Sequence, residues 1–267
     1  MTDYQAVTQR QQVTWSTGDF NAIARKTMAM SERLIEAVDP HAGQRVLDVA
    51  CGSGNAAIVA GRRDCEVTGI DYVPDLIERA RMRATAEGLD IDFQVGDAQA
   101  LPFEDASFDV VVSVLGVMFA PDQEKAASEL LRVCRPGGTI GLVSWMPKDF
   151  GGDFFAAHAR YAPPPPGVNP PVRWGTDAGL QELLGDGVSS IDSQERVTFG
   201  HFRSIDHTFD LHRTYFGPTI KAFETADAGA HADLRKDICD VFERYNRATD
   251  GTAVVEYKYL QTIAKRA

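Results

Sequence analysis

The chain has 267 residues, of which 44% are hydrophobic, so it is long enough to bury a full hydrophobic core. Its formal net charge of -11 opposes binding to the phosphate backbone of a nucleic acid, which depends on clustered lysines and arginines. No apolar run reaches the ~20 residues that a membrane-spanning helix needs, and the polar start lacks the pattern of a signal peptide. We therefore expect a cytoplasmic protein that binds neither nucleic acid nor membrane.

The first forty residues are predicted to be helical after a polar start. Apolar residues recur at roughly helical spacing between Ile23 and Val38, and Pro40 ends the pattern. From residue 45 onward, short apolar runs alternate with helical stretches, which is typical of parallel strands joined by right-handed helical crossovers. The predicted strands of this part are Arg45–Val49, Glu66–Ile70, Ile91–Val95, Phe108–Val114 and Thr139–Ser144.

Helices are predicted in most of the gaps between these strands. One begins at Pro74 and ends at Gly88, and another runs from about Asp122 to Arg135 before a Pro-Gly-Gly turn. After Trp145 the prolines at 163–166 and 170–171 predict a stiff, extended connection.

The last part of the chain is predicted to complete the sheet. Arg196–Phe202 and Tyr257–Ala264 mix apolar and polar residues, as strands at an antiparallel sheet edge do. Helices at Asp206–Tyr215 and Asp233–Tyr245 are expected to fold over the sheet's ligand-binding edge. The predicted fold class is α/β: a doubly wound, mostly parallel seven-stranded sheet with an antiparallel edge strand and a helical cap.

The most informative motif follows the first predicted strand. It reads Asp48-Val49-Ala50-Cys51-Gly52-Ser53-Gly54-Asn55, and a second acid, Asp71, closes the next apolar run. Small residues at a strand end let a ligand approach the backbone, and the amides of the next helix can bind its polar groups. In open α/β sheets ligands bind beyond the carboxyl ends of the strands, where Asp71 could accept both hydroxyls of a ribose. The motif therefore predicts a nucleoside-binding fold.

Two cofactors compete for this site. Gly52-Ser-Gly54-Asn-Ala-Ala57 also satisfies the G-x-G-x-x-G/A pattern of dinucleotide binding, so an NAD(P)-dependent oxidoreductase is one hypothesis. A pyrophosphate beside Asp48 would meet like charge, whereas the ammonium and sulfonium of S-adenosylmethionine would be attracted. The acid favours S-adenosylmethionine, either as a methyl donor or as the ligand of a non-catalytic binding module.

Residues 45–145 resemble a class I S-adenosylmethionine-dependent methyltransferase of the small-molecule type. Val46–Asn55 resembles the first motif of that family, and Gly69-Ile70-Asp71 resembles its ribose-binding second strand. Gly96–Gln99 resembles the adenine-side loop, and Leu131–Gly138 resembles the turn into the fifth strand. The family implies three parts: an N-terminal flap (1–40), a cofactor-binding Rossmann-like core (41–146) and, in 147–267, the remaining strands with an inserted substrate cap, within one domain overall.

The resemblance also implies where the cofactor would bind. Its methionine portion would lie near Asp48, Ala50, Gly52 and Gly54, and Leu115 would lie beside the donor. Asp71 would bind the ribose, and Asp97 and Ala98 would lie at the adenine. Asn55 and Tyr72, which directly follow Gly54 and Asp71, are counted with these residues. Many relatives have glycine where this chain has Ala50, so the loop is expected to be slightly less open.

The segment from Trp15 to Phe20 resembles the part that folds over the cofactor in related enzymes. An aromatic face near the sulfonium would add a cation–π attraction of ~0.5 to 2 kcal/mol. The alternative is that Trp15 and Phe20 merely pin the flap to the core.

The acceptor is expected to be a small, aromatic or otherwise apolar metabolite. Candidate acceptor-binding residues are Met118, Phe119, Trp145, Trp174 and Tyr215. Some relatives have a histidine just after the fourth strand, but this chain has Leu115-Gly-Val-Met-Phe119 there, so a base at that position is in doubt. Candidate bases elsewhere are His158, His201, His207, His212 and His231.

The four cysteines lack metal-ligand spacing, so no metal is expected. The catalytic residues, the acceptor atom and the oligomeric state stay open.

Overall fold

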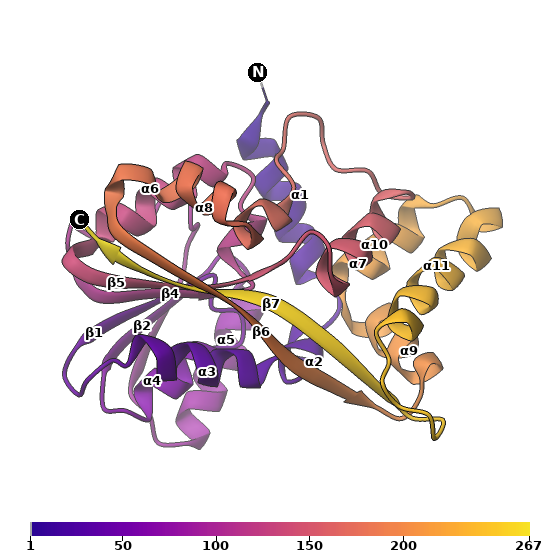
Figure 1. Cartoon of the computed structure of the whole chain (residues 1–267), viewed down its shortest axis with the longest axis horizontal. Coiled ribbons are helices and arrows are strands. Elements are labelled where there is room, and N and C mark those ends of the chain that lie inside the picture. The colour runs from indigo at the N-terminus through magenta and orange to yellow at the C-terminus, as the bar shows by residue number, and fades with distance from the viewer. Residues whose placement is uncertain (1) are drawn as a thin grey trace.

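The computed structural model describes residues 2–267, and it contains one seven-stranded sheet in the order β3-β2-β1-β4-β5-β7-β6 (Figure 1). The strands are β1 (Arg45–Val49), β2 (Glu66–Asp71), β3 (Ile91–Val95), β4 (Phe108–Val114), β5 (Cys134–Trp145), β6 (Val188–Phe202) and β7 (Ala253–Arg266). The first five are parallel, and β7 is antiparallel to both β5 and β6. The predicted fold class is therefore confirmed.

Helices cover both faces of the sheet (Figure 1). One face carries α3 (Met28–Val38), α4 (Asn55–Gly61) and α5 (Pro74–Ala86), and the other carries α6 (Gln123–Val133) and α8 (Asp177–Leu184). Because both faces are covered, β1 and β4 are runs of buried aliphatic residues such as Val46, Leu47, Val111 and Val112.

Four helices form the cap, which lies beyond the carboxyl ends of the parallel strands, at the right of Figure 1. They are α7 (Phe150–Ala159), α9 (Ile205–Tyr215), α10 (Gly217–Thr225) and α11 (His231–Arg244). Their shared core is aromatic: the ring of Phe154 stacks on that of Phe150 with centroids 5.3 Å apart, and it contacts that of Phe242 at 5.5 Å. The cap is therefore built around a cluster of phenylalanines.

The N-terminal helices α1 (Tyr4–Ser16) and α2 (Phe20–Ala24) are joined to the cap at one backbone crossing. The amide of Asp19 donates to the carbonyl of Tyr215 at 3.0 Å, and Gly18 forms a β-bridge with Phe216. A Cβ on Gly217 would lie 1.9 Å from the carbonyl oxygen of Thr14. Glycine at 217 is therefore what allows the two backbones to approach so closely.

The edge strand β6 begins at Val188, eight residues before the predicted start at Arg196. The prediction was wrong because the added segment, Ser189–Glu195, is almost entirely polar. As an edge strand, β6 pairs with β7 alone, and most of the side chains in this segment are exposed. Backbone pairing rather than side-chain burial holds this segment in the sheet. Similarly, β5 begins at Cys134, before the Pro-Gly-Gly turn that the sequence predicts to precede it.

None of the helices in residues 2–267 combines the length and the apolar character that crossing a membrane requires.

Candidate active site

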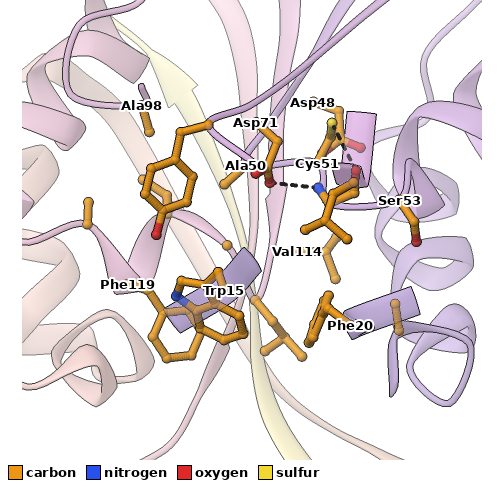
Figure 2. Close-up of a pocket in the computed structure, with 18 of the residues that line it drawn as sticks. Trp15, Phe20, Asp48, Ala50, Cys51, Ser53, Asp71, Ala98, Val114 and Phe119 are labelled. Carbon is orange, nitrogen blue, oxygen red and sulfur yellow. Dashed lines mark hydrogen bonds between the residues drawn. The ribbon is translucent and has the colours of Figure 1, made fainter. Parts of the chain in front are cut away.

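A cavity of ≈ 980 Å³, partly open to solvent, lies at the carboxyl ends of β1, β2 and β4. In the view of Figure 2 the carboxylates of Asp48 and Asp71 lie at the top, and the aromatic side chains of Trp15, Phe20 and Phe119 lie at the bottom. The cavity thus has an acidic side, formed by the sheet, and an aromatic side, formed by the flap and by η1 (Val117–Phe119).

Left-handed backbone shapes the turn after β1. Ala50, Gly52 and Gly54 have φ values of 53°, 55° and 81°. Ala50 is strained in this conformation because its Cβ crowds its own backbone. The same Cβ also needs room on the facing loop. Gly116 supplies that space, since a Cβ on Gly116 would lie 2.8 Å from the Cβ of Ala50. The alanine at this position is therefore accommodated by a glycine on the facing loop.

Gly54, one of the predicted cofactor-binding residues, is tightly packed against neighbouring side chains. A Cβ on this residue would lie 3.0 Å from the ring of Phe93 and 3.1 Å from the Cβ of Ala80. Gly54 does not line the cavity, whereas Asn55 does. The buried amide of Asn55 donates to the carbonyl of Ala24 and accepts from Arg83, which fixes the flap against the start of α4.

Asp71 connects the ends of β2 and β1. Its Oδ2 accepts the amide of Gly52 at 2.9 Å, and its Oδ1 accepts the amide of Val73 at 2.9 Å. Each carboxylate oxygen has two lone pairs, so both oxygens can still accept a hydroxyl group. Burial raises the pKa of this carboxyl to about 6, despite the two amide donors. The side chain is thus fixed in place and able to bind a pair of hydroxyls.

Asp48 is the second buried acid of the cavity. Its Oδ2 accepts the amide of Ala57, in the first turn of α4, at 2.9 Å. Burial, with a smaller contribution from the charge of Asp71, raises the pKa of the Asp48 carboxyl to about 7. No lysine or arginine in residues 2–267 forms an ion pair with Asp48 or Asp71, so a bound cation would relieve an uncompensated charge.

A polar network closes the far end of the cavity. The carboxylate of Asp97 accepts the backbone amide of Gln99 at 2.9 Å and its side-chain amide at 3.0 Å. The same side-chain amide of Gln99 donates to Thr8 in α1 at 3.0 Å. Asp97, Ala98 and Tyr72 all line this end of the cavity.

Three aromatic rings cover the opposite side. The ring centroid of Trp15 lies 5.4 Å from that of Phe20 and 5.0 Å from that of Phe119. Leu115 completes this aromatic wall; its left-handed backbone, with φ of 52°, follows directly after β4. Its amide donates to the carbonyl of Val143, which ties the bend to β5.

A second cavity, of ≈ 630 Å³, lies between the core and the cap. Five residues line both cavities: Trp15, Phe20, Thr27, Leu115 and Phe119. The aromatic wall therefore marks where the two cavities meet. Of the predicted acceptor-binding residues, Phe119 and Trp145 line the second cavity.

The other three predicted acceptor-binding residues, Met118, Trp174 and Tyr215, line neither cavity. Met118 and Trp174 are buried in the core, where Gly175, next to Trp174, packs against the carbonyl of Trp145. Tyr215 is 40% exposed at the surface. All three therefore lie outside the two cavities, and the sequence alone does not show which way an aromatic or methionine side chain points.

Sequence reasoning missed most of the second cavity. Its remaining wall comes from α7, the end of β6, α9 and β7, and includes Phe150, Phe154, Phe155, Phe202, Phe216 and Tyr257. The i, i+4 pair Phe150 and Phe154 predicts one apolar helix face, but the partner of that face depends on the tertiary fold. In the first cavity, sequence reasoning also missed Ser31 of α3, whose buried Oγ has no hydrogen-bond partner in residues 2–267.

Two of the five candidate histidines are buried, and one of these lines a cavity. His158 bonds to Phe154 through Nδ1 and to Thr219 through Nε2, while His212 lines the second cavity. Burial lowers the pKa of each of these two imidazoles to about 4. His201, His207 and His231 line neither cavity.

Cys51 lines the first cavity, and burial raises the pKa of its thiol well above the usual value, which suits a packing role.

The comparisons with known proteins agree with this geometry. Residues 47–142 match the family model of a methyltransferase domain. An uncharacterized protein of Mycobacterium tuberculosis is 38% identical over 257 residues, which cover 94% of this chain and 92% of that protein. The chain belongs to the class I S-adenosylmethionine-dependent methyltransferases.

The chain resembles one named enzyme over part of its length and one solved structure over most of it. A demethylmenaquinone methyltransferase of Deinococcus radiodurans is 41% identical over 109 residues, or 40% of this chain and 45% of that enzyme. The crystal structure of the YcgJ protein of Bacillus subtilis superposes with a TM-score of 0.61 at 22% identity, covering 89% and 98% of the two chains.

A ligand-bound structure shares this methyltransferase fold. The geranyl diphosphate C-methyltransferase of Streptomyces coelicolor was solved with S-adenosyl-L-homocysteine. It superposes with a TM-score of 0.55 at 17% identity, covering 90% of this chain and 79% of that one. At this identity the likeness shows the fold alone.

The methyltransferase's first cavity fits S-adenosylmethionine in charge and in shape. Two buried carboxyls without basic partners suit a ligand that carries an ammonium and a sulfonium. A Cβ on Gly52 would meet only the ring of Phe20, at 3.8 Å, so the turn leaves room beside its backbone. The unpartnered hydroxyl of Ser31 offers one further polar contact.

Proposed function

We propose that this methyltransferase moves the methyl group of S-adenosylmethionine to a small, mainly apolar or aromatic molecule. The observation that carries the proposal is the meeting of two unlike cavities at one aromatic wall. One contains the buried acids Asp48 and Asp71, and the other is lined by aromatic side chains. A cationic donor suits the first, and an apolar acceptor suits the second.

Within the first cavity, we propose a place for each part of the cofactor. The ribose hydroxyls would bind the free lone pairs of Asp71, and the adenine would lie near Asp97 and Ala98. The methionine portion would lie near Asp48, at the turn that holds Ala50 and Gly52. The described residues hold no group of three or more His, Cys, Asp or Glu side chains that could bind a metal ion, so we propose no metal site.

The remaining task is alignment and exclusion of water. When bound, the cofactor supplies a methyl group on a positively charged sulfur, which is already activated for displacement. Trp15, Phe20 and Phe119 cover the place where donor and acceptor would meet. A close, dry approach of two reactants can by itself supply a large part of a catalytic effect. This account requires no fixed acid–base pair.

The rival functions are less favoured by the charge of the cavity. An NAD(P)-dependent oxidoreductase would have to place a pyrophosphate beside Asp48 and Asp71, where like charges repel. A non-catalytic binding module would bind S-adenosylmethionine without consuming it. These functions predict different ligands or different products.

The test is incubation of the protein with methyl-labelled S-adenosylmethionine and extracts of small metabolites, followed by mass spectrometry. We expect labelled products that require the protein and that disappear in the Asp71→Ala variant. A parallel thermal-shift assay should show stabilisation by S-adenosylmethionine but not by NAD or NADP. Stabilisation by the donor without any labelled product, across varied extracts, would instead favour the binding module.

A further inference from the structure

The second cavity has a chemical character of its own. Its wall is mainly aromatic, with Phe150, Phe154 and Phe155 from α7 and Phe202, Phe216 and Tyr257 from other elements. Lys26 is the one charged side chain that lines it within residues 2–267. A pocket of this kind favours flat, uncharged molecules, because aromatic side chains pack well against a buried ring and cannot solvate a charge.

Lys26 makes two contacts at the end of β6. Its Nζ donates to the carbonyl of His201 at 2.7 Å and lies 4.9 Å from the ring centroid of Phe202. Burial lowers the pKa of this ammonium, so its charge is weakly stabilised by its surroundings. One of the three N–H donors of this ammonium is therefore already paired, at a place where burial disfavours its charge.

His212, on α9, presents a hydrogen-bond acceptor. Its Nδ1 lies 2.8 Å from the carbonyl oxygen of Thr208, one turn earlier in the same helix. A carbonyl can only accept, so Nδ1 carries the proton, and in the neutral ring Nε2 keeps its lone pair. The side chain is 5% exposed, and no residue in 2–267 forms a hydrogen bond with Nε2.

His158 provides an internal comparison. It makes the same bond from Nδ1 to the carbonyl one turn earlier, that of Phe154, at 2.7 Å. Its Nε2, however, pairs with the hydroxyl of Thr219 at 2.8 Å, and the residue does not line the cavity. Two histidines with the same bond from Nδ1 thus differ at Nε2 and in place: only His212 lines the cavity, and its Nε2 has no partner among residues 2–267.

We infer that the second cavity binds an uncharged aromatic acceptor that carries a hydroxyl group, and that Nε2 of His212 accepts the hydrogen bond of this hydroxyl. The inference rests on the proposed function and deepens it by naming the acceptor class. It makes His212 a positioning residue, which orients the hydroxyl-bearing ring against the aromatic wall shared with the first cavity. Because burial also lowers the pKa of His212 to about 4, the lone pair is present throughout the neutral range.

The test uses the full-length protein and two probes of nearly the same shape. Equilibrium dialysis compares 2-naphthol with 2-methoxynaphthalene, which has the same rings but no O–H donor, with and without S-adenosylhomocysteine. We expect 2-naphthol to bind about 3- to 10-fold more tightly than the ether, the effect of one neutral hydrogen bond in a buried site.

Three variants separate the hydrogen bond from packing. His212→Phe should bring the two affinities to within about 2-fold of each other, while the affinity for the ether stays nearly unchanged. His212→Gln, which restores a carbonyl acceptor, should recover part of the preference, and the matched control His158→Phe should retain the preference of the wild type. On the wild-type protein itself, the ¹⁵N resonance of the His212 Nε2 should shift with 2-naphthol and not with the ether.

Each contrary outcome is specific. A preference for 2-naphthol that persists in His212→Phe, an unmoved Nε2 resonance or a failure of either probe to bind would overturn the inference. Tighter binding of 2-naphthoate than of 2-naphthol would also overturn it and would indicate an anionic acceptor held by Lys26. Binding of S-adenosylhomocysteine is measured separately. If S-adenosylhomocysteine does not bind, that result counts against the proposed function, whereas the two probes alone test the assignment of His212.

Discussion

The carboxylate of Asp71 accepts the backbone amide of Gly52 at 2.9 Å, so the acid that ends β2 also holds the turn that follows β1. This bond crosses between two neighbouring parallel strands at their carboxyl ends. A single side chain therefore shapes the glycine-containing turn and offers lone pairs to a ligand. The geometry of the cofactor site and its chemistry depend on the same residue.

Replacing Asp71 should weaken binding of the cofactor. The Asp71→Ala variant loses charge-assisted hydrogen bonds, so we expect a loss on the order of 1.5 to 3 kcal/mol in the binding of S-adenosylhomocysteine, measured by calorimetry. Asp92→Ala, which removes an exposed acid from β3, is the control for the change in net charge. An unchanged affinity in Asp71→Ala would refute the ribose assignment.

Binding of S-adenosylmethionine should strengthen as the pH rises from about 5 to 8. Burial raises the pKa of Asp48 to about 7 and that of Asp71 to about 6, and a bound cation favours the ionised form of both. Binding near pH 6 should therefore release protons, which calorimetry detects as a dependence of the apparent enthalpy on the ionisation enthalpy of the buffer. An affinity that is flat over this range would contradict the account.

The Asp48→Asn substitution should stabilise the ligand-free protein and weaken its binding of S-adenosylmethionine. A carboxyl with a raised pKa in the folded state binds more protons there than in the unfolded state, so its ionisation costs stability as the pH rises from about 4 through 7. The amide removes this cost and can still accept the amide of Ala57. At pH 8 we expect a gain on the order of 1 to 3 kcal/mol in the free energy of unfolding. A lower melting temperature for the variant than for the wild type would show that the ionised carboxylate of Asp48 does not destabilise the folded protein.

Much of the fold could be predicted because its signals are local. The strands from Arg45 to Val114 are short apolar runs, and Pro74 marks the start of α5 within one residue. By contrast, the polar start of β6 at Val188–Glu195 carries no such signal, because an edge strand forms through backbone pairing with β7. Sequence patterns report burial, and this segment is largely exposed.

The two cavities differ in how far the sequence predicts them. Asp48 and Asp71 lie at the carboxyl ends of β1 and β2, and Ala98 lies in the loop after β3, so the strand order alone brings them together. The second cavity gathers residues from α7, β6, α9 and β7, and its members depend on how the cap helices dock. For this reason Trp174 was expected in the acceptor pocket and lies in the core instead.

Gly217→Ala should loosen the flap. The added Cβ would lie 1.9 Å from the carbonyl oxygen of Thr14, so α1 and α10 could not keep their present approach. Because Trp15 and Phe20 belong to the displaced segment, we expect cofactor affinity to fall several-fold and limited proteolysis near the N-terminus to accelerate. Gly229→Ala is the matched control, since its Cβ would meet nothing within 4 Å. Equal proteolysis rates in the two variants would contradict this role of the crossing.

We expect the acidic cavity beyond β1 and β2 to bind a cationic nucleoside rather than a dinucleotide. The most direct measurement is a crystal structure of the protein soaked with equal concentrations of S-adenosylmethionine and NAD. We expect density for the sulfonium nucleoside, with its ribose hydroxyls on Asp71 and its methionine portion near Asp48. Density for a diphosphate beside Asp48 would contradict it.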